Sequence, residues 1–493
     1  MSDPVVETTS GIAVPVRRRL KTAVTMAYGF GSVAYGAKDA AFGTFLLIYY
    51  NQVLGLNSFK VGLVIMCALV LDAFIDPMVG ILSDRTRSRW GRRHPWLYAS
   101  AAPIAIGWLL LWNPPAGSET FRLGWLFVTA VITRSAVSCF EVPSQALTPE
   151  LTTDYDERTR ITAYRYLFGW AGGLSIVLLA YGVFLTSRPD YPNGLFNPAG
   201  YHNLALVSAV LMVVAILVSA FGTHGEIHRL PQVDTQPQSF GAVIGELWQT
   251  LHNRGFVVLI LAGVCAYTNQ GVSYALANYF YAYAWQLSPG ALQLLPLTLF
   301  AGATGAFLIA PRASRTTSKP RAACLFVLSG ATVYASFCAL FLFDLLPPPG
   351  WGRVAILFPL FAIQTALNVS SFILGASMMA DVVEEAQART GRRNEGVFFA
   401  GSFFVQKCTS GLGIAVAGAI LALAGLQDKI DPATASPGKV YNLVLWFILI
   451  YGALACVAAL LFTRFPFGRA EHEARLSKMA AAAENEGLPH VSP

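Results

Sequence analysis

Charged side chains are scarce in this sequence. Asp, Glu, Lys and Arg make up only 12% of its 493 residues, whereas a soluble domain carries about 25%. Hydrophobic residues account for 55%, and the mean hydropathy is +0.53. A water-soluble protein of this length does not reach such values, so the composition argues against a soluble enzyme.

The motifs of hydrolytic and ATP-driven chemistry are also missing. The sequence contains no Walker A, GxSxG or HExxH pattern, and such reactions usually draw their residues from these motifs. Its seven cysteines fall within apolar segments and have no CxxC or CxH spacing, so we expect buried thiols rather than disulfides or a cysteine metal site. We therefore predict that the protein is not an enzyme and has no cofactor.

Long apolar runs recur along nearly the whole chain. Crossing about 30 Å of hydrocarbon at 1.5 Å per residue takes about 20 residues, and the runs predict an all-α membrane protein with twelve transmembrane helices. The predicted spans lie at roughly 22–51, 58–83, 95–113, 121–148, 160–186, 202–223, 253–286, 289–311, 321–345, 352–380, 395–425 and 440–463.

A polar, proline-bearing stretch, HRLPQVDTQPQSF, divides these spans into six and six. Two six-helix halves are the layout of a transporter whose halves rock about a site at the midplane. We expect a cytoplasmic tail (1–21), an N-terminal six-helix bundle (22–224), a cytoplasmic linker (225–252), a C-terminal six-helix bundle (253–463) and a second cytoplasmic tail (464–493).

The basic residues are unevenly distributed. The net charge is +7 and the isoelectric point is near 9.0, but most of the 34 Lys and Arg residues fall in the two tails and in the loops on their side of the predicted spans. Because basic residues concentrate in cytoplasmic loops, we predict a multi-pass protein of the plasma membrane, as in a bacterial inner membrane, with both termini in the cytoplasm. The basic excess then reflects topology, and we expect no nucleic-acid partner.

Two acids in the second predicted span are four residues apart. Asp72 and Asp76, in LDAFIDPMVG, therefore share one face of a helix. Two carboxylates in an apolar span bind a cation, share a proton or pair with a base. Two separate structural ion pairs are the plainer interpretation.

Other charges also lie within predicted spans. Lys38 and Asp39 are adjacent in the first span, so they point about 100° apart on a helix, and a structural salt bridge is the simpler alternative to a substrate site. The acids and bases balance four against four, which suggests a compensated network. Arg134 could be a structural member that pairs near the outer side. The set comprises Asp39, Asp72, Asp76 and Glu141 with Lys38, Arg134, Arg165 and Lys407.

A GxxxDR pattern follows the two acids. Gly80 permits close helix approach, and Asp84 and Arg85 lead into a basic loop. In the second half, Asp381 precedes another basic segment. Asp84, Arg85 and Asp381 are candidate members of a cytoplasmic gate, although solvated loop charges explain them equally well.

Taken together, these segments resemble a known family. The motifs DAFIDPMVG with SDRTRSRWGRRHPW, FEVPSQALTPELTTDYDERTRITAYR and MADVVEEAQARTGRRNEGVFFAGSFFVQK are similar to those of the glycoside-pentoside-hexuronide:cation symporters. These form the melibiose-permease branch of the major facilitator superfamily. The resemblance covers essentially the whole membrane region and implies the major facilitator superfamily fold.

The resemblance implies a cation site. The acids of the family's second span correspond to Asp72 and Asp76, the hydroxyl of the fourth span to Ser138, and the lysine of the eleventh span to Lys407. Asp72 and Asp76 would be metal ligands only if sodium is the coupling ion. Ile75 stands where sodium-using melibiose permeases have Asn, which removes an oxygen and favours a proton over sodium.

The resemblance also implies a sugar site. Its acids correspond to Asp39 and Glu141, with Lys38 and Arg165 as cationic neighbours. The chain departs from the melibiose permease in having Glu at position 141 and Gln145 in place of an aromatic residue, so galactoside specificity does not carry over. Aromatic side chains near the charges, Phe372 among them, are candidates for stacking on a sugar ring or for ordinary packing.

These observations favour a secondary active transporter, a cation (H⁺ or Na⁺)-coupled symporter of a sugar or glycoside that works by alternating access. Its expected partners are a small-molecule substrate and membrane lipid, and we expect a monomer. Two alternatives are a cation-coupled transporter of an amphipathic substrate such as a lysolipid, and a non-transporting membrane sensor.

Overall fold

The computed structural model describes residues 20–152, 154–230, 253–390 and 395–466, together with positions 241, 245 and 251. Apart from one isolated bridge between Arg188 and Tyr191, the regular structure of these residues is helical. The predicted tails and linker lie almost entirely outside them. The main helices, with the π-helical turns that continue three of them, are α1 (Thr22–Phe30), α2 (Ser32–Ile48, then Tyr49–Val53), α3 (Ser58–Arg85), α4 (His94–Leu111), α5 (Glu119–Leu151), α6 (Tyr155–Leu179, then Ala180–Phe184), α7 (Pro198–His224), α9 (Arg254–Tyr279, then Phe280–Ala284), α10 (Pro289–Thr316), α11 (Lys319–Leu342), α12 (Trp351–Thr390), α13 (Glu395–Leu423) and α14 (Pro437–Thr463).

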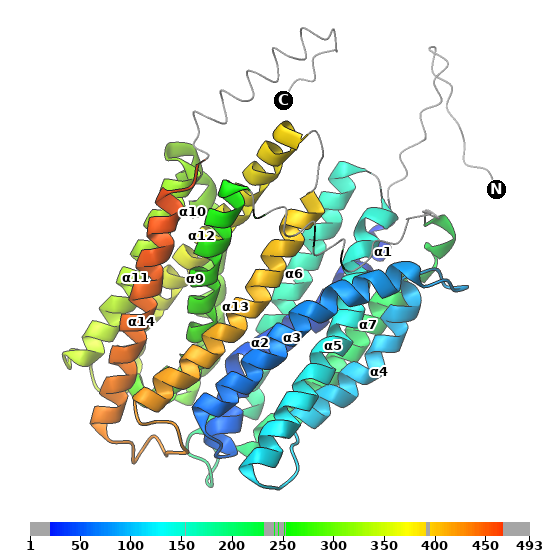
Figure 1. The fold of residues 1–493 in the computed structure, drawn as a ribbon. Helices are drawn as coiled ribbons and strands as arrows, with labels where there is room; N and C mark the ends of the chain where they lie inside the picture. Colours follow the sequence, from blue (N-terminus) through cyan, green and yellow to red (C-terminus); the bar gives the residue numbers. More distant parts are fainter. Residues whose placement is uncertain are drawn as a thin grey trace, which may run out of the picture.

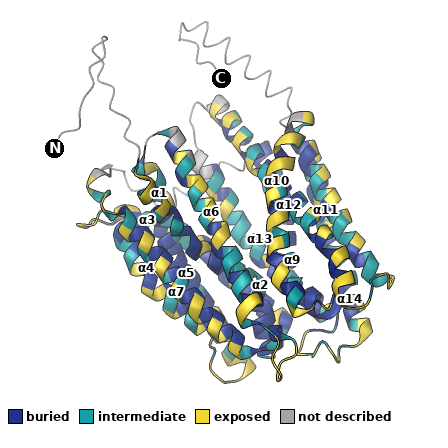
Figure 2. Cartoon of the chain, turned by 180° about the vertical axis from the view of Figure 1, so that it is seen from behind, coloured by how far each residue is buried: buried dark blue, intermediate teal, exposed yellow. Residues whose placement is uncertain are grey.

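Ten of these helices are long and apolar enough to cross a membrane. The remaining two predicted spans correspond to shorter helices: the first is divided between α1 and α2 at Gly31, and the third is α4, of 18 residues. Exposed residues recur along the helices (Figure 2), and many of them are large and apolar. Phe221 and Phe307, for example, are both 65% exposed. Such an exterior is suited to contact with lipid.

Polar side chains begin several of the helices. Asn57 accepts a hydrogen bond from the backbone N–H of Lys60, and Asn253 accepts one from Phe256. Pro289 and Pro437 each occupy the first helical position, where the missing N–H has no partner in any case. These caps fix where the chain turns between antiparallel neighbours.

The helices pack in two groups (Figure 1). In the first group, α2 packs against α6, α5 against α3 and α4, and α7 against α1, α2 and α4. In the second group, α12 packs against α10 and α11, and α14 against α9 and α11. Helix α13 packs against both α9 and α3, and α2 packs against α9, so these helices form the interface between the groups.

The two groups are closed against each other at one end. Glycines let the backbones of α3 and α13 touch, since a Cβ on Gly418 would lie 2.5 Å from the Ser58 carbonyl oxygen and one on Gly62 would lie 2.8 Å from that of Ile414. The fully buried Gln52 amide accepts hydrogen bonds from Tyr283 Oη at 3.0 Å and from the backbone N–H of Ile430 at 2.9 Å. This polar end joins the first group to the second.

No hydrogen bond or ion pair between the groups is found at the opposite end, which carries Asp84 and Asp381, among the residues that the structure describes. Moving from the closed end, the last such bonds between the groups are those of Lys407 to Asp72 and Asp76. Beside them, Phe74 of α3 contacts Phe404 of α13 edge to face, with ring centres 5.1 Å apart. Among the described residues, such bonds therefore join the groups on one side of these acids, and none is found on the other.

Candidate functional site

The acids of α3 lie at the interface between the two helix groups. Asp72 is 2% exposed, and its Oδ1 accepts a hydrogen bond from Ser138 Oγ of α5 at 3.0 Å. Lys407 of α13 reaches both acids, with its Nζ 3.1 Å from Asp72 Oδ2 and 2.5 Å from Asp76 Oδ2. The structure thus brings together all four residues predicted for the cation site.

A fifth residue belongs to this cluster. Arg134 of α5 contacts Asp72 Oδ2 through Nε at 2.9 Å and through Nη2 at 2.8 Å. The expectation that Arg134 is a structural residue pairing near the outer side missed this contact. Its spacing carries the signal, because Arg134 precedes Ser138 by one helical turn and so shares its face.

One oxygen of the two carboxylates differs from the others in its hydrogen bonding. Asp76 Oδ1 is buried and has no hydrogen-bond partner among the described residues, although the Asp76 side chain as a whole is 26% exposed. Pro77 follows it in α3 without breaking the helix. Asp76 is therefore the more accessible acid of the pair and Asp72 the fully enclosed one.

The predicted substrate residues of α2 form a close ion pair. Lys38 Nζ lies 2.5 Å from Asp39 Oδ1, and the Lys38 side chain is 3% exposed while that of Asp39 is 42% exposed. The ring of Tyr35 lies 4.9 Å from Lys38 Nζ. Asp39 thus presents an open carboxylate that is held by a buried ammonium.

Glu141 and Gln145 are neighbours on α5. Gln145 Nε2 donates to Glu141 Oε1 at 3.0 Å, and Gln145 is exposed. Asp39, Lys38 and Lys407 all act electrostatically on Glu141. Glu141 therefore lies within electrostatic range of the ion pair of α2 and of Lys407, with Gln145 as its hydrogen-bond partner.

Arg165 of α6 contacts polar groups rather than acids. Its Nη1 donates to Tyr28 Oη at 2.9 Å and to Ser144 Oγ at 2.8 Å, and the guanidinium lies over the Tyr28 ring, 5.2 Å from its centre. Tyr28 in turn donates to the backbone carbonyl of Ser144. Arg165 therefore links α6 to α1 through Tyr28 and to α5 through Ser144, three residues after Glu141.

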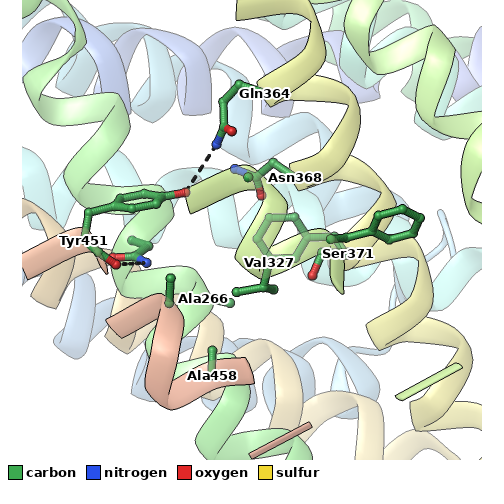
Figure 3. Close-up of a pocket in the computed structure, with 12 residues that line it drawn as sticks. Ala266, Val327, Gln364, Asn368, Ser371, Tyr451 and Ala458 are labelled. Carbon is green, nitrogen blue, oxygen red and sulfur yellow. Dashed lines mark hydrogen bonds between the residues drawn. The ribbon is translucent and has the colours of Figure 1, made fainter. Parts of the chain in front are cut away.

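Phe372 lies in a different place from the charged residues. Its ring stacks on Tyr267, with centres 5.2 Å apart, and it lines a pocket within the second group, between α9, α11, α12 and α14 (Figure 3). Gln364 and Asn269 also line this pocket and donate to the hydroxyl and the backbone carbonyl of Tyr451 at 3.3 and 3.1 Å. Phe372 therefore has a packing partner of its own in this pocket.

Two of the three predicted gate residues, Asp84 and Asp381, form ion pairs within their own groups. Asp84 forms an ion pair with Arg93, whose Nε also contacts Glu150 Oε1 at 3.0 Å. Asp381 of α12 contacts Lys319 of α11 at 2.7 and 2.8 Å. Arg85 is exposed and has no ion pair among the described residues. None of these contacts crosses between the groups.

Comparisons with known proteins find one family model, similar sequences and solved structures of the same fold. The sequence model described as "MFS/sugar transport protein" matches residues 27–469. The isoprimeverose transporter of Lactiplantibacillus pentosus is 24% identical and aligns over 88% of this chain and 87% of its own length. The sodium-dependent lysophosphatidylcholine symporter 1-A of Danio rerio is also 24% identical, over 96% of this chain and 92% of its own. Among solved structures, the inward open conformation of the xylose transporter XylE from E. coli has a TM-score of 0.58 at 14% identity, covering 91% of this chain and 96% of that one.

Proposed function

The chain belongs to the MFS/sugar transport protein family, and on this premise we propose that it couples entry of a sugar or glycoside to that of a cation by alternating access. It is a membrane transporter and not an enzyme. One observation carries the proposal: the acids of α3 and the ion pair of α2 belong to a single electrostatic cluster. Lys407 Nζ lies 3.1 Å from Asp72 Oδ2 and 2.5 Å from Asp76 Oδ2, and the charges of Lys407 and Lys38 both lie within electrostatic range of Glu141.

Such a cluster provides the physical basis of coupling. A cation that binds at the α3 acids changes the field at Glu141 and Asp39, and a substrate bound there changes the field at the α3 acids. By linkage, each ligand alters the affinity of the other by the same factor. The coupling ion of this mechanism is a proton or sodium.

In this mechanism each predicted site residue has a role. Asp39 and Glu141 accept hydrogen bonds from substrate hydroxyls, Lys38 and Arg165 orient the acids and the surrounding helices, and Gln145 offers an exposed amide. Asp72, Asp76, Ser138 and Lys407 form the coupling site. Phe372, in the pocket of the second group, contributes an aromatic surface to the substrate path.

We further propose that the two helix groups are the six-helix halves of a twelve-span transporter that works as a monomer. The protein is a multi-pass membrane protein, and its basic loops favour a bacterial inner membrane with both termini in the cytoplasm. With that orientation, the closed end at Gln52 faces outward and the end bearing Asp84 and Asp381 faces the cytoplasm. The closed outer end then corresponds to an inward-facing state. Asp84, Arg85 and Asp381 would gate that end in the opposite state.

Counterflow of a panel of glycosides tests this function while the natural sugar is still unidentified. Proteoliposomes preloaded with one unlabelled glycoside from the panel are diluted into the labelled form at fixed pH, with and without sodium. We expect transient accumulation for at least one glycoside, and its loss in Asp39→Asn. Asp190→Asn, in an exposed loop, is the matched control and should retain full counterflow. If no glycoside gives counterflow, or if Asp39→Asn retains it, the proposal is wrong.

A second candidate substrate is a lysophospholipid. It is favoured by the zebrafish relative, which aligns over 96% of this chain, and by the exposed Gln145 in place of an aromatic residue. Counterflow of lysophosphatidylcholine, measured beside the glycosides, decides between a lysophospholipid and a glycoside as the substrate. Binding of a ligand without counterflow by any compound would instead indicate a sensor.

A further inference from the structure

We propose that Arg134 acts as a built-in cation at Asp72 and excludes sodium from the acids of α3. The inference rests on the proposed function, because it identifies an ion that the symporter does not use. Arg134 is thereby a determinant of ion specificity that the motifs of the sequence did not indicate.

The first argument is the contact itself. Two nitrogens of the guanidinium, Nε and Nη2, lie 2.9 and 2.8 Å from the same oxygen, Asp72 Oδ2. The other oxygen, Oδ1, accepts from Ser138 Oγ at 3.0 Å. Ser138 is the hydroxyl expected to bind the cation. The two expected ligands, Asp72 and Ser138, therefore already have partners, since Asp72 binds both Arg134 and Ser138. A sodium ion beside Asp72 would have to displace a guanidinium or lie next to one.

The second argument is burial. Arg134 is 5% exposed, and its guanidinium lies over the ring of Phe42, 5.1 Å from the ring centre. A buried guanidinium cannot give up its proton or retreat into water at low cost. Asp72 is 2% exposed, so neither partner has an alternative in solvent. The pair therefore persists once it is formed.

The third argument is that the pair does not depend on the conformational state. Asp72, Arg134 and Phe42 belong to α3, α5 and α2, all in the first helix group. Lys407 belongs to α13 of the second group, so its contacts with the acids change when the groups move. Lys407 can leave the acids when a cation binds and return when it is released, so it is compatible with sodium coupling. Arg134 moves together with Asp72, so it stays paired with Asp72 in both states.

The fourth argument is charge balance. Asp72 and Asp76 carry two negative charges, and the two cations in direct contact with them, Arg134 and Lys407, carry two positive charges. These four residues are therefore neutral among themselves without an added ion. The free Asp76 Oδ1 is one oxygen, whereas a sodium ion needs several. The donor set therefore does not fit sodium.

Thermal unfolding of the purified full-length protein tests this inference without a substrate. The melting temperature is measured in sodium chloride and in choline chloride at equal ionic strength and pH. We expect no difference for the wild type, and a rise in sodium for Arg134→Ala, which frees Asp72. Arg134→Lys, which keeps the charge, should remain insensitive to sodium, as should Arg122→Ala, a control on the same helix whose guanidinium contacts only the Leu54 carbonyl among the described residues.

Sodium stabilisation of the wild type would overturn the inference, even if no variant could be purified. A folded Arg134→Ala that ignores sodium in the unfolding assay would overturn it as well. In counterflow, Arg134→Ala should become at least tenfold faster with sodium than with choline, while the wild type changes less than twofold. Failure of counterflow with every compound would instead count against the proposed function, because the unfolding result does not depend on transport.

Discussion

The pairing of Asp72 with Arg134 predicts a strong energetic coupling between the two residues. Asp72→Asn leaves Arg134 and Lys407 opposite the single charge of Asp76, so the cluster gains a net positive charge in a buried place. Removing one partner of a buried ion pair costs about 3–5 kcal/mol, and unit charges about 4 Å apart interact by about 4 kcal/mol at an effective dielectric constant of about 20. We expect Asp72→Asn to destabilise the protein by an amount in this range.

Arg134→Gln should be similarly costly, because it leaves Asp72 with only Ser138 and the more distant Lys407. The double variant Asp72→Asn/Arg134→Gln restores neutrality, since Asp76 and Lys407 remain as a balanced pair. Its loss of stability should be smaller than the sum of the two single losses by at least about 2 kcal/mol. The assay is unfolding in detergent micelles, followed by tryptophan fluorescence, for the wild type and the three variants.

Strict additivity of the two substitutions would refute this reasoning. It would mean that the charges of Asp72 and Arg134 do not interact in the folded protein, and the contact at 2.8 Å would have no energetic content. A control cycle between Asp72 and Arg122, which lie in different parts of α3 and α5, should be additive.

Three further predictions concern the closed end and the substrate site. Gly418→Leu should hold the closed end open, because a Cβ there would lie 2.5 Å from the Ser58 carbonyl oxygen. A cysteine placed at Thr44 in a cysteine-free background should then react faster with an impermeant maleimide. An unchanged rate would show that this end was not closed. Gln52→Leu should have the same direction of effect at a cost of about 1–3 kcal/mol for each polar partner left unsatisfied, and unaltered labelling at Thr44 would argue against the role of its hydrogen bonds. Arg165→Lys keeps the charge but cannot reproduce the contacts of the guanidinium with Tyr28 and Ser144, so half-saturation in counterflow should need about tenfold more substrate; an unchanged concentration dependence would remove Arg165 from the site.

The fold was largely accessible from the sequence because the membrane imposes a length on apolar runs. Where helix and span differ, the reason is that a helix need not end where hydrophobicity ends. Helix α12 continues to Thr390, ten residues beyond the predicted span. From Asp381 onwards it alternates charged residues with buried apolar ones such as Val382 and Val383, so the hydropathy falls while the helix continues. The first span is divided at Gly31, a break that hydropathy does not register.

The cation cluster was partly accessible from the sequence. Helical spacing placed Asp72 and Asp76 on one face, and the resemblance added Ser138 and Lys407. Arg134 was missed although it shares a helix face with Ser138, because that spacing alone does not say which neighbouring helix the face contacts. That choice depends on how α5 is rotated against α3, which is set by packing along the whole helix pair.

Gradient-driven uptake tests the central claim, cation-coupled symport, most directly. Proteoliposomes containing the wild type are given an inward gradient of protons or of sodium, and labelled glycoside is followed over time. The account predicts accumulation above the external concentration, abolished by an ionophore for the coupling ion and reduced to simple equilibration in Asp72→Asn. Accumulation that survives in Asp72→Asn, or a wild type that only equilibrates its substrate under either gradient, would contradict it.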